Sequence, residues 1–293
     1  MSKEIVLLVF GLSLGAVYAL IVLGLVLTYR TSKFLNLAHG ALGMVVTYVF
    51  WQLAVGWGLP TWLSAVLTLG LVAPIVGVVA GRVLFRGVMS KDDTSKIAAS
   101  VIVILVLNEA VSRIWSAGAR DVPSLMPAGS VAIGGARLGW DQLIPIGIAI
   151  GVAALIVLGL TKTSIGVQMR AVAEDRALAA SFGCNVARVE AIGWALATVL
   201  AGAAGLLIAP LSALTPLSLT FLVVSGLAAA AVGRLTSVAG ALAGAALLGV
   251  AQSEVVRLPA GVIEKISSPS SAMPFLLLAG AIGVMVRAGV DVG

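Results

Sequence analysis

The sequence predicts an all-α polytopic membrane protein, and its composition, the length of its apolar segments and the placement of its basic residues all support this fold class. Hydrophobic residues make up 60% of the 293 positions and charged residues only 10%, whereas soluble domains carry about 25% charged residues. Such a chain cannot cover its own surface with polar groups, so lipid must be its solvent. Because a spanning helix needs about 20 residues, residues 1–293 can form a single transmembrane domain of about 8–10 helices.

The apolar segments are bounded by charged residues, proline or aromatic residues. The segment at 217–232 is short and lies between Pro216 and Gly233. It could be a half-helix or a re-entrant element, and so could the ninth segment, because such elements are tolerated where protein buries them. The nine predicted segments are 5–29, 35–56, 62–85, 97–116, 142–161, 191–210, 217–232, 236–256 and 273–287.

The basic residues predict the orientation of these segments, because cytoplasmic loops carry an excess of Lys and Arg. If the turn with Arg30 and Lys33 is cytoplasmic and the segments alternate, 12 of the 18 Lys and Arg residues lie inside. The opposite orientation reverses this bias. We therefore expect the N-terminus outside, the C-terminus inside, and the aromatic turn at 51–62 at the outer interface.

Glycine pairs four residues apart predict close packing of helices, because a helix face without side chains lets two backbones approach in lipid. Glycine occurs 34 times in the chain. The pairs with this spacing are Gly11/Gly15, Gly77/Gly81, Gly147/Gly151 and Gly240/Gly244.

Two connections are long enough to carry structure of their own. Residues 117–141 are interrupted by Gly and Pro and show short β-like alternation, which predicts an external loop. Residues 162–190 form a cytoplasmic loop in the predicted orientation. Within it, 174–182 is a run of helix-forming residues with two acidic residues in its first turn and Gly183 as the expected C-cap.

The sequence shows no pattern for catalysis or nucleotide binding. The Walker A pattern is absent, so we expect no ATP binding by that route. The predicted spans contain no paired carboxylates, HExxH motif or Ser/His/Asp set, so we expect no catalytic residues, and we expect no cofactor in this chain. With one cysteine, Cys184, and one histidine, His39, we expect no disulfide framework and no metal site. The net charge of +6 is typical of cytoplasmic loops that face anionic headgroups. Membrane lipid is therefore the expected contact, and nucleic acid is not.

A few polar residues lie at membrane depth, where each should face the bundle interior or a polar cavity. Asn36 and His39 lie three residues apart in NLAHG, at the start of the second segment. His39 either bonds a neighbouring carbonyl and fixes the entry of that helix, or contributes with Asn36 to a gate or substrate path. In the fourth segment, Asn108 and Glu109 are further candidates for this path. Glu109 can also form an i, i+4 ion pair with Arg113.

Three blocks of the sequence resemble the branched-chain amino acid-type ABC transporter permease family. GLSLGAVYALIVLGLVLTYRTSKFLNLAHGALGMVVTYV (11–49) resembles the opening of these permeases, in which a G-x-x-x-G-x-x-Y-A-L helix precedes an N-[FL]-A-H-G segment. IGVQMRAVAEDRALAASFGCNVARVEAIGWALATVLAGAAGLL (165–207) resembles the cytoplasmic loop and the following span. VGRLTSVAGALAGAALLGVAQSEV (232–255) resembles the late Gly-rich helix. The sequence departs from the family pattern at two places. It has GRLTSVAGAL where the family often has a more Gly-rich turn, and its linker at 29–34 is more basic. These departures bear on the identity of the transported substrate more than on the architecture.

The resemblance implies a multi-pass permease subunit of a binding-protein-dependent importer in the bacterial inner membrane. Its partners would be ATP-binding cassette subunits, which hydrolyse ATP, a second permease that is homologous or identical, and an extracytoplasmic solute-binding protein. Similar permeases dock a short cytoplasmic coupling helix on the ATP-binding subunit, and 169–183 matches that element. The residues implied for this contact are Met169, Arg170, Ala173, Glu174, Asp175, Leu178, Phe182 and Gly183.

The transported solute stays open at this point, since branched-chain amino acids, urea, short amides and aromatic or steroid acids all suit the family. A stand-alone secondary transporter or channel is the alternative function. That alternative predicts paired acidic residues or broken helices near the bilayer midplane, and acidic residues are nearly absent from the predicted spans.

Overall fold

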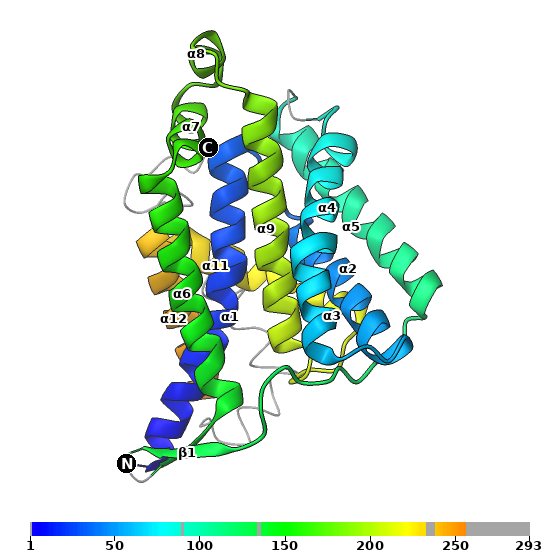
Figure 1. Ribbon diagram of the computed structural model, residues 1–293, viewed down its shortest axis with the longest axis vertical. Coiled ribbons are helices and arrows are strands. Elements are labelled where there is room, and N and C mark those ends of the chain that lie inside the picture. The colour runs from blue at the N-terminus through cyan, green and yellow to red at the C-terminus, as the bar shows by residue number, and fades with distance from the viewer. Residues whose placement is uncertain (1, 89–90, 134–135, 233–237, 256–293) are drawn as a thin grey trace. The chain divides into compact units, whose positions relative to one another are not determined.

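The computed structural model describes residues 2–88, 91–133, 136–232 and 238–255 (Figure 1). Within these ranges, six helical stretches are long and apolar enough to cross a membrane, and two shorter apolar helical stretches follow at Pro216–Ala231 and Val238–Glu254. The predicted all-α membrane fold is therefore confirmed. The ninth predicted segment, 273–287, lies outside the described residues.

Two of the long helical stretches contain π-helical turns. The stretch that begins with α2 ends in a π-helical turn, and the stretch from 61 to 84 contains two. The elements of the six stretches are α1 (Ser2–Ser32), α2 (His39–Trp51), η1 (Gln52–Gly56), α3 (Thr61–Leu67), η2 (Thr68–Val72), α4 (Ala73–Val79), η3 (Ala80–Leu84), α5 (Asp93–Trp115), α6 (Trp140–Lys162) and α9 (Val186–Ile208).

The remaining elements are short. In the predicted external loop, β1 (Ser130–Ile133) and β2 (Ala136–Gly139) pair as an antiparallel hairpin, which agrees with the β-like alternation of that segment. The short helices are α7 (Ser164–Glu174), α8 (Arg176–Ser181), α10 (Pro216–Thr220), α11 (Leu222–Val232) and α12 (Val238–Val255).

Polar side chains determine where several helices begin, because each accepts a hydrogen bond from an otherwise unpaired amide of the first turn. Asp92 accepts hydrogen bonds from the amide and the hydroxyl of Ser95 at the start of α5. The side chains of Thr163, Asn185 and Thr215 cap α7, α9 and α10 in the same way. These caps are local, so the sequence fixes the helix starts without help from distant contacts.

The chain divides into two compact units. The first contains residues 1–22, 126–151 and 224–293. In it, α1 packs closely on α12 through Gly11 and Gly15: a Cβ added at Gly15 would lie 2.8 Å from the carbonyl oxygen of Ala245. Tyr18 donates a hydrogen bond to the side chain of Gln252 on α12. The packing predicted for the first glycine pair is therefore confirmed.

The second unit contains residues 23–125 and 152–223. Its central helix is α9, which lies beside α2 and α4 (Figure 1). Gly77 and Gly81 form the contact with α9, and a Cβ added at Gly81 would lie 2.7 Å from the indole ring of Trp194. By contrast, a Cβ added at Gly147 or Gly151 would meet no described atom within 4 Å.

Two buried clusters hold the second unit together at one end. In the first, the rings of Phe34, Phe85 and Trp194 pack with centroid distances of 4.8 Å (Phe34–Phe85) and 5.2 Å (Phe85–Trp194). In the second, residues of α1, α6 and α9 enclose residues of α7 and α8. The members of this second cluster are Leu27, Leu160, Met169, Val172, Ala179 and Val189.

Candidate functional site

The segment NLAHG, with Asn36 and His39, lies deep inside the second unit. A Cβ added at Gly24 would lie 2.5 Å from Nε2 of His39, so the imidazole rests directly on the α1 backbone. Gly24 precedes Ser32, the end of α1, by eight residues, which corresponds to about 12 Å along the helix. The non-helical connection 33–38 therefore turns back into the bundle before α2 begins. Irregular backbone at such depth needs burial in protein or a cavity.

The polar side chains of this segment are sealed from solvent. Asn36 is 1% exposed and His39 is 0% exposed. The side-chain oxygen and nitrogen of Asn36 have no hydrogen-bond partner within the described residues. An unpaired buried amide costs about 1–3 kcal/mol, so this position stores free energy that a polar ligand group could recover.

A second polar pair connects α5 and α10 beside the start of α2. Asn108 donates a hydrogen bond of 3.1 Å to the hydroxyl of Thr220, the residue at which α10 ends. The backbone carbonyl of Thr220 in turn faces Gly40, which follows His39. Two of the predicted path positions, the NLAHG segment and Asn108, thus meet at the interruption between α10 and α11.

Glu109 does not join this cluster. Its side chain is 63% exposed and forms an ion pair with Arg113 at 2.6 Å, and the Arg113 side chain is 79% exposed. The pairing anticipated at i, i+4 is therefore present, on an exposed part of α5. Conversely, no sequence pattern indicated that Gly24, Gly40 and Thr220 belong to the cluster.

The segment proposed as the coupling helix consists of two helices and not one. The backbone leaves the helical conformation at Asp175, with φ −144° and ψ 111°, and the Asp175 carboxylate caps α8 by accepting hydrogen bonds from the amides of Ala177 and Leu178. The expected helical run 174–182 is thus corrected: Glu174 ends α7, and α8 begins at Arg176. An aspartate cap competes with helix continuation because its side chain satisfies the first-turn amides.

The end of α8 follows the expectation closely. Gly183 has φ +81°, a conformation that glycine adopts without steric cost. Its amide bonds the carbonyl of Ala180, and the amide of Cys184 bonds that of Ala179. This pattern is a Schellman motif, and it confirms Gly183 as the residue that terminates the helix.

The residues implied for coupling differ in exposure. Leu178 is 55% exposed and Phe182 is 83% exposed, and together with Glu174 and Asp175 they border a shallow cleft of about 250 Å³ between α7 and α8. Met169 is only 3% exposed and packs in the second buried cluster. The side chain of Arg170 donates a hydrogen bond to the carbonyl of Leu160, and the side chain of Arg176 forms an ion pair with Glu190. Ala173 is half-buried. Among these coupling residues, the large apolar side chains left exposed are Leu178 and Phe182.

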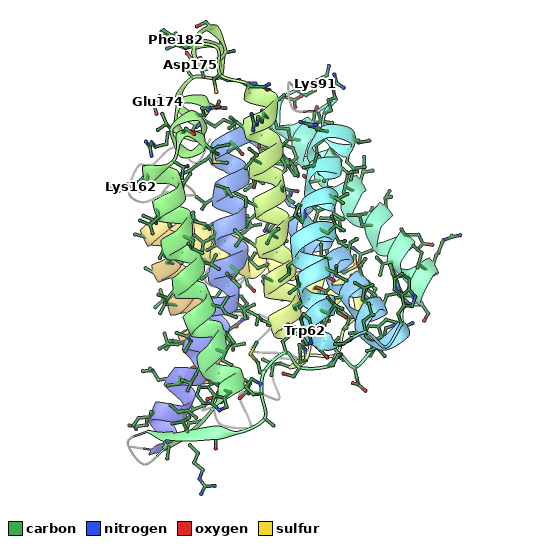
Figure 2. The ribbon with its side chains drawn as sticks, in the orientation of Figure 1. Trp62, Lys91, Lys162, Glu174, Asp175 and Phe182 are labelled. Carbon is green, nitrogen blue, oxygen red and sulfur yellow. The ribbon has the colours of Figure 1, made fainter. Side chains whose placement is uncertain are left out.

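This helix pair lies at the end of the second unit where the basic residues gather. Figure 2 shows Lys91, Lys162, Asp175 and Phe182 at one end and Trp62 at the other. Of the 12 Lys and Arg residues in this unit, the predicted orientation places ten at the former end and two, Arg113 and Arg120, at the latter. Lys91 and Lys162 thus lie at the opposite end from Trp62 of the aromatic turn; the orientation of these ends in the membrane stays a prediction.

The fold and these features define a polytopic membrane protein. Residues 7–285 match the family described as branched-chain amino acid transport system / permease component. The chain belongs to this family, and it is a permease component of an ABC importer. The family resemblance noted in the sequence is confirmed.

Similar proteins cover most of the chain. BraD of Pseudomonas aeruginosa, a high-affinity branched-chain amino acid transport system permease protein, is 25% identical over 84% of this chain and 84% of its own length. LivH of Methanocaldococcus jannaschii, a probable branched-chain amino acid transport permease protein, is 27% identical over 80% of this chain and 75% of its own length. LivH of Escherichia coli K12 is 28% identical over 83% of both chains.

Proposed function

We propose that this permease couples to a separate ATP-binding subunit through the α7–α8 pair. The observation that carries the proposal is the exposure of Leu178 and Phe182, two apolar side chains four residues apart on a short helix at the predicted cytoplasmic end. Large apolar side chains exposed together on a soluble loop mark a protein contact. Glu174 and Asp175 beside them supply polar groups for its rim.

The base of the helix pair suits the transmission of force into the membrane. Met169, Val172 and Ala179 pack against Leu27 of α1, Leu160 of α6 and Val189 of α9. Because a packed cluster deforms little, a push on α7 and α8 would move these spans together instead of compressing the loop. Alternating access of the transport path would follow from the resulting tilt of the helices.

The solute path of the second unit is proposed at the cluster of Asn36, His39, Asn108 and Thr220. The unpaired amide of Asn36 and the interruption of the helices there support binding of a small polar solute. The names of the relatives favour a branched-chain amino acid, whose ammonium and carboxylate need both acceptors and donors. Glu109 is not part of this proposal because it faces outward.

The proposal also covers the partner subunits of this permease and the membrane that contains it. The importer would contain ATP-binding cassette subunits that hydrolyse ATP, a second permease and an extracytoplasmic solute-binding protein, in a bacterial inner membrane. No cofactor is assigned to this chain.

The test is the double substitution Leu178→Ala/Phe182→Ala in the assembled importer. Truncating buried interface anchors costs about 2 kcal/mol or more each, so the ATP-binding subunit should no longer copurify and uptake should stop. The matched control is Leu217→Ala/Phe221→Ala, another Leu/Phe pair at i, i+4, with exposures of 62% and 58%. That variant should retain the ATP-binding subunit. Equal retention by both variants would reject the proposed contact.

A further inference from the structure

A cleft with an excess of positive charge opens at the predicted cytoplasmic end of the second unit. It has a volume of about 650 Å³, and its charged lining consists of Arg82, Arg86, Arg176 and Glu190. Three guanidinium groups and one carboxylate give this lining a net charge of +2 (3 − 1). The Glu190 carboxylate pairs with Arg176. Among the described residues, no carboxylate lies within ion-pair distance of Arg82 or Arg86.

The walls of the cleft are well fixed. Arg82 lies in η3, and Arg86 follows Phe85, whose ring stacks on Trp194 at 5.2 Å. Trp194 itself is 1% exposed and lines the cleft together with Gly81. Since the aromatic packing holds this backbone in place, the protein ordering needed to bind an anion is confined to the exposed side chains of Arg82 and Arg86.

The cleft lies at the boundary between hydrocarbon and water. Val79, Val83 and Leu84, which surround Arg82 on the same helical stretch, are 46%, 69% and 42% exposed. In a membrane protein, such exposed apolar side chains face lipid tails, whereas the basic loops next to them face the cytoplasmic surface. The cytoplasmic leaflet is rich in anionic lipid, and basic pockets on this side of a membrane suit phosphate headgroups.

We propose that this cleft binds the phosphate group of an anionic phospholipid of the cytoplasmic leaflet, with Arg82 and Arg86 as its ligands. Guanidinium groups bind phosphate oxygens in pairs and keep their charge at every physiological pH. Arg176, which begins α8, is shared between the phosphate and Glu190. The lipid therefore contacts the helix that we assign to coupling, although its binding does not depend on that assignment.

The experiment compares two double variants of the full-length chain purified in neutral detergent. Native mass spectrometry measures binding of phosphatidylglycerol and of phosphatidylcholine. Arg82→Gln/Arg86→Gln should weaken phosphatidylglycerol binding by about tenfold or more, since both charge-assisted contacts to the phosphate would be lost. The control, Lys162→Gln/Arg188→Gln, removes the same charge from the same end at positions that do not line the cleft, and it should bind like the unchanged chain.

Four results would overturn the proposal. Three of them are equal binding of the two phospholipids, equal weakening by both double variants, and binding of orthophosphate as tight as that of the lipid, which would assign the cleft to a free anion. Displacement of phosphatidylglycerol when the ATP-binding subunit is added, with protection of the two arginines, would assign the cleft to that protein and would also overturn it. Arg82→Lys/Arg86→Lys keeps the charge and should keep the preference for phosphatidylglycerol, which separates loss of the site from loss of folding.

Discussion

The contact between Gly24 and His39 predicts that Gly24→Ala disturbs the buried NLAHG segment. A Cβ at this position would lie 2.5 Å from Nε2 and 2.6 Å from Cε1 of His39, and 3.1 Å from the carbonyl oxygen of Ala197. Ordinary contact begins near 3.4 Å, so the imidazole would have to retreat by about 0.9 Å. It has little room to do so, because His39 is fully buried.

The expected cost follows from two opposing effects. Overpacking a well-packed interior costs about 1–3 kcal/mol. Alanine recovers at most about 1 kcal/mol of this because it is a better helix former than glycine. We therefore expect Gly24→Ala to lower stability by up to about 3 kcal/mol and to slow uptake through displacement of His39 and Asn36.

A double-mutant cycle with His39→Ala isolates this contact. Removing the imidazole makes room for the new Cβ, so the double variant should be more stable than the sum of the two single effects predicts, by about 1 kcal/mol or more. Unfolding of the purified chain in detergent and uptake in reconstituted vesicles are the measurements. Gly147→Ala is the control, since its Cβ would meet no described atom within 4 Å and should not destabilise. Strictly additive effects of Gly24→Ala and His39→Ala would refute the reasoning.

Three further predictions concern the loops. Asp175→Ala should cost about 0.5–2 kcal/mol locally through loss of the α8 cap, and hydrogen exchange should show faster exchange in α8 with α9 unchanged. The hydrogen bonds from the Ser95 hydroxyl and amide hold the pKa of Asp92 below its usual value. The cap of α5 should therefore stay intact at neutral pH and be lost only as the pH falls through that lowered pKa. The protection of the Ser95 amide, which is the ratio of its intrinsic to its observed exchange rate, should fall only in acid, and an unchanged protection at low pH would contradict this. A reporter fused after Lys162 should be cytoplasmic and one near Ser130 external, and finding both on one side would refute the orientation.

The spans and the glycine contacts were predictable because their physical causes are local or repetitive. Apolar length identified each of the six described stretches, and the four-residue spacing of Gly11/Gly15 and Gly77/Gly81 marked faces that meet another helix. The same spacing at Gly147/Gly151 meets nothing in the described residues. Spacing identifies a smooth face, whereas the presence of a partner depends on tertiary structure.

The polar cluster could be predicted only in part. Asn36, His39 and Asn108 were recognisable because polar side chains are rare at membrane depth. Thr220 was not, because its role depends on a contact across 112 residues of sequence with Asn108. The break at Asp175 was missed for another reason: the acidic residues of 174–182 suit both a first helical turn and a cap, and only the backbone distinguishes the two.

The exposed tip of α8 also has a consequence for biogenesis. Before its proposed partner binds, a newly inserted copy of this chain would expose the phenyl ring of Phe182, 83% exposed, on the predicted cytoplasmic side. Such a surface invites self-association and recognition by quality-control proteases. A cell that makes this chain in excess over its partner should therefore degrade the surplus. The ring that would transmit force in the assembled importer would thus also mark unassembled copies for degradation.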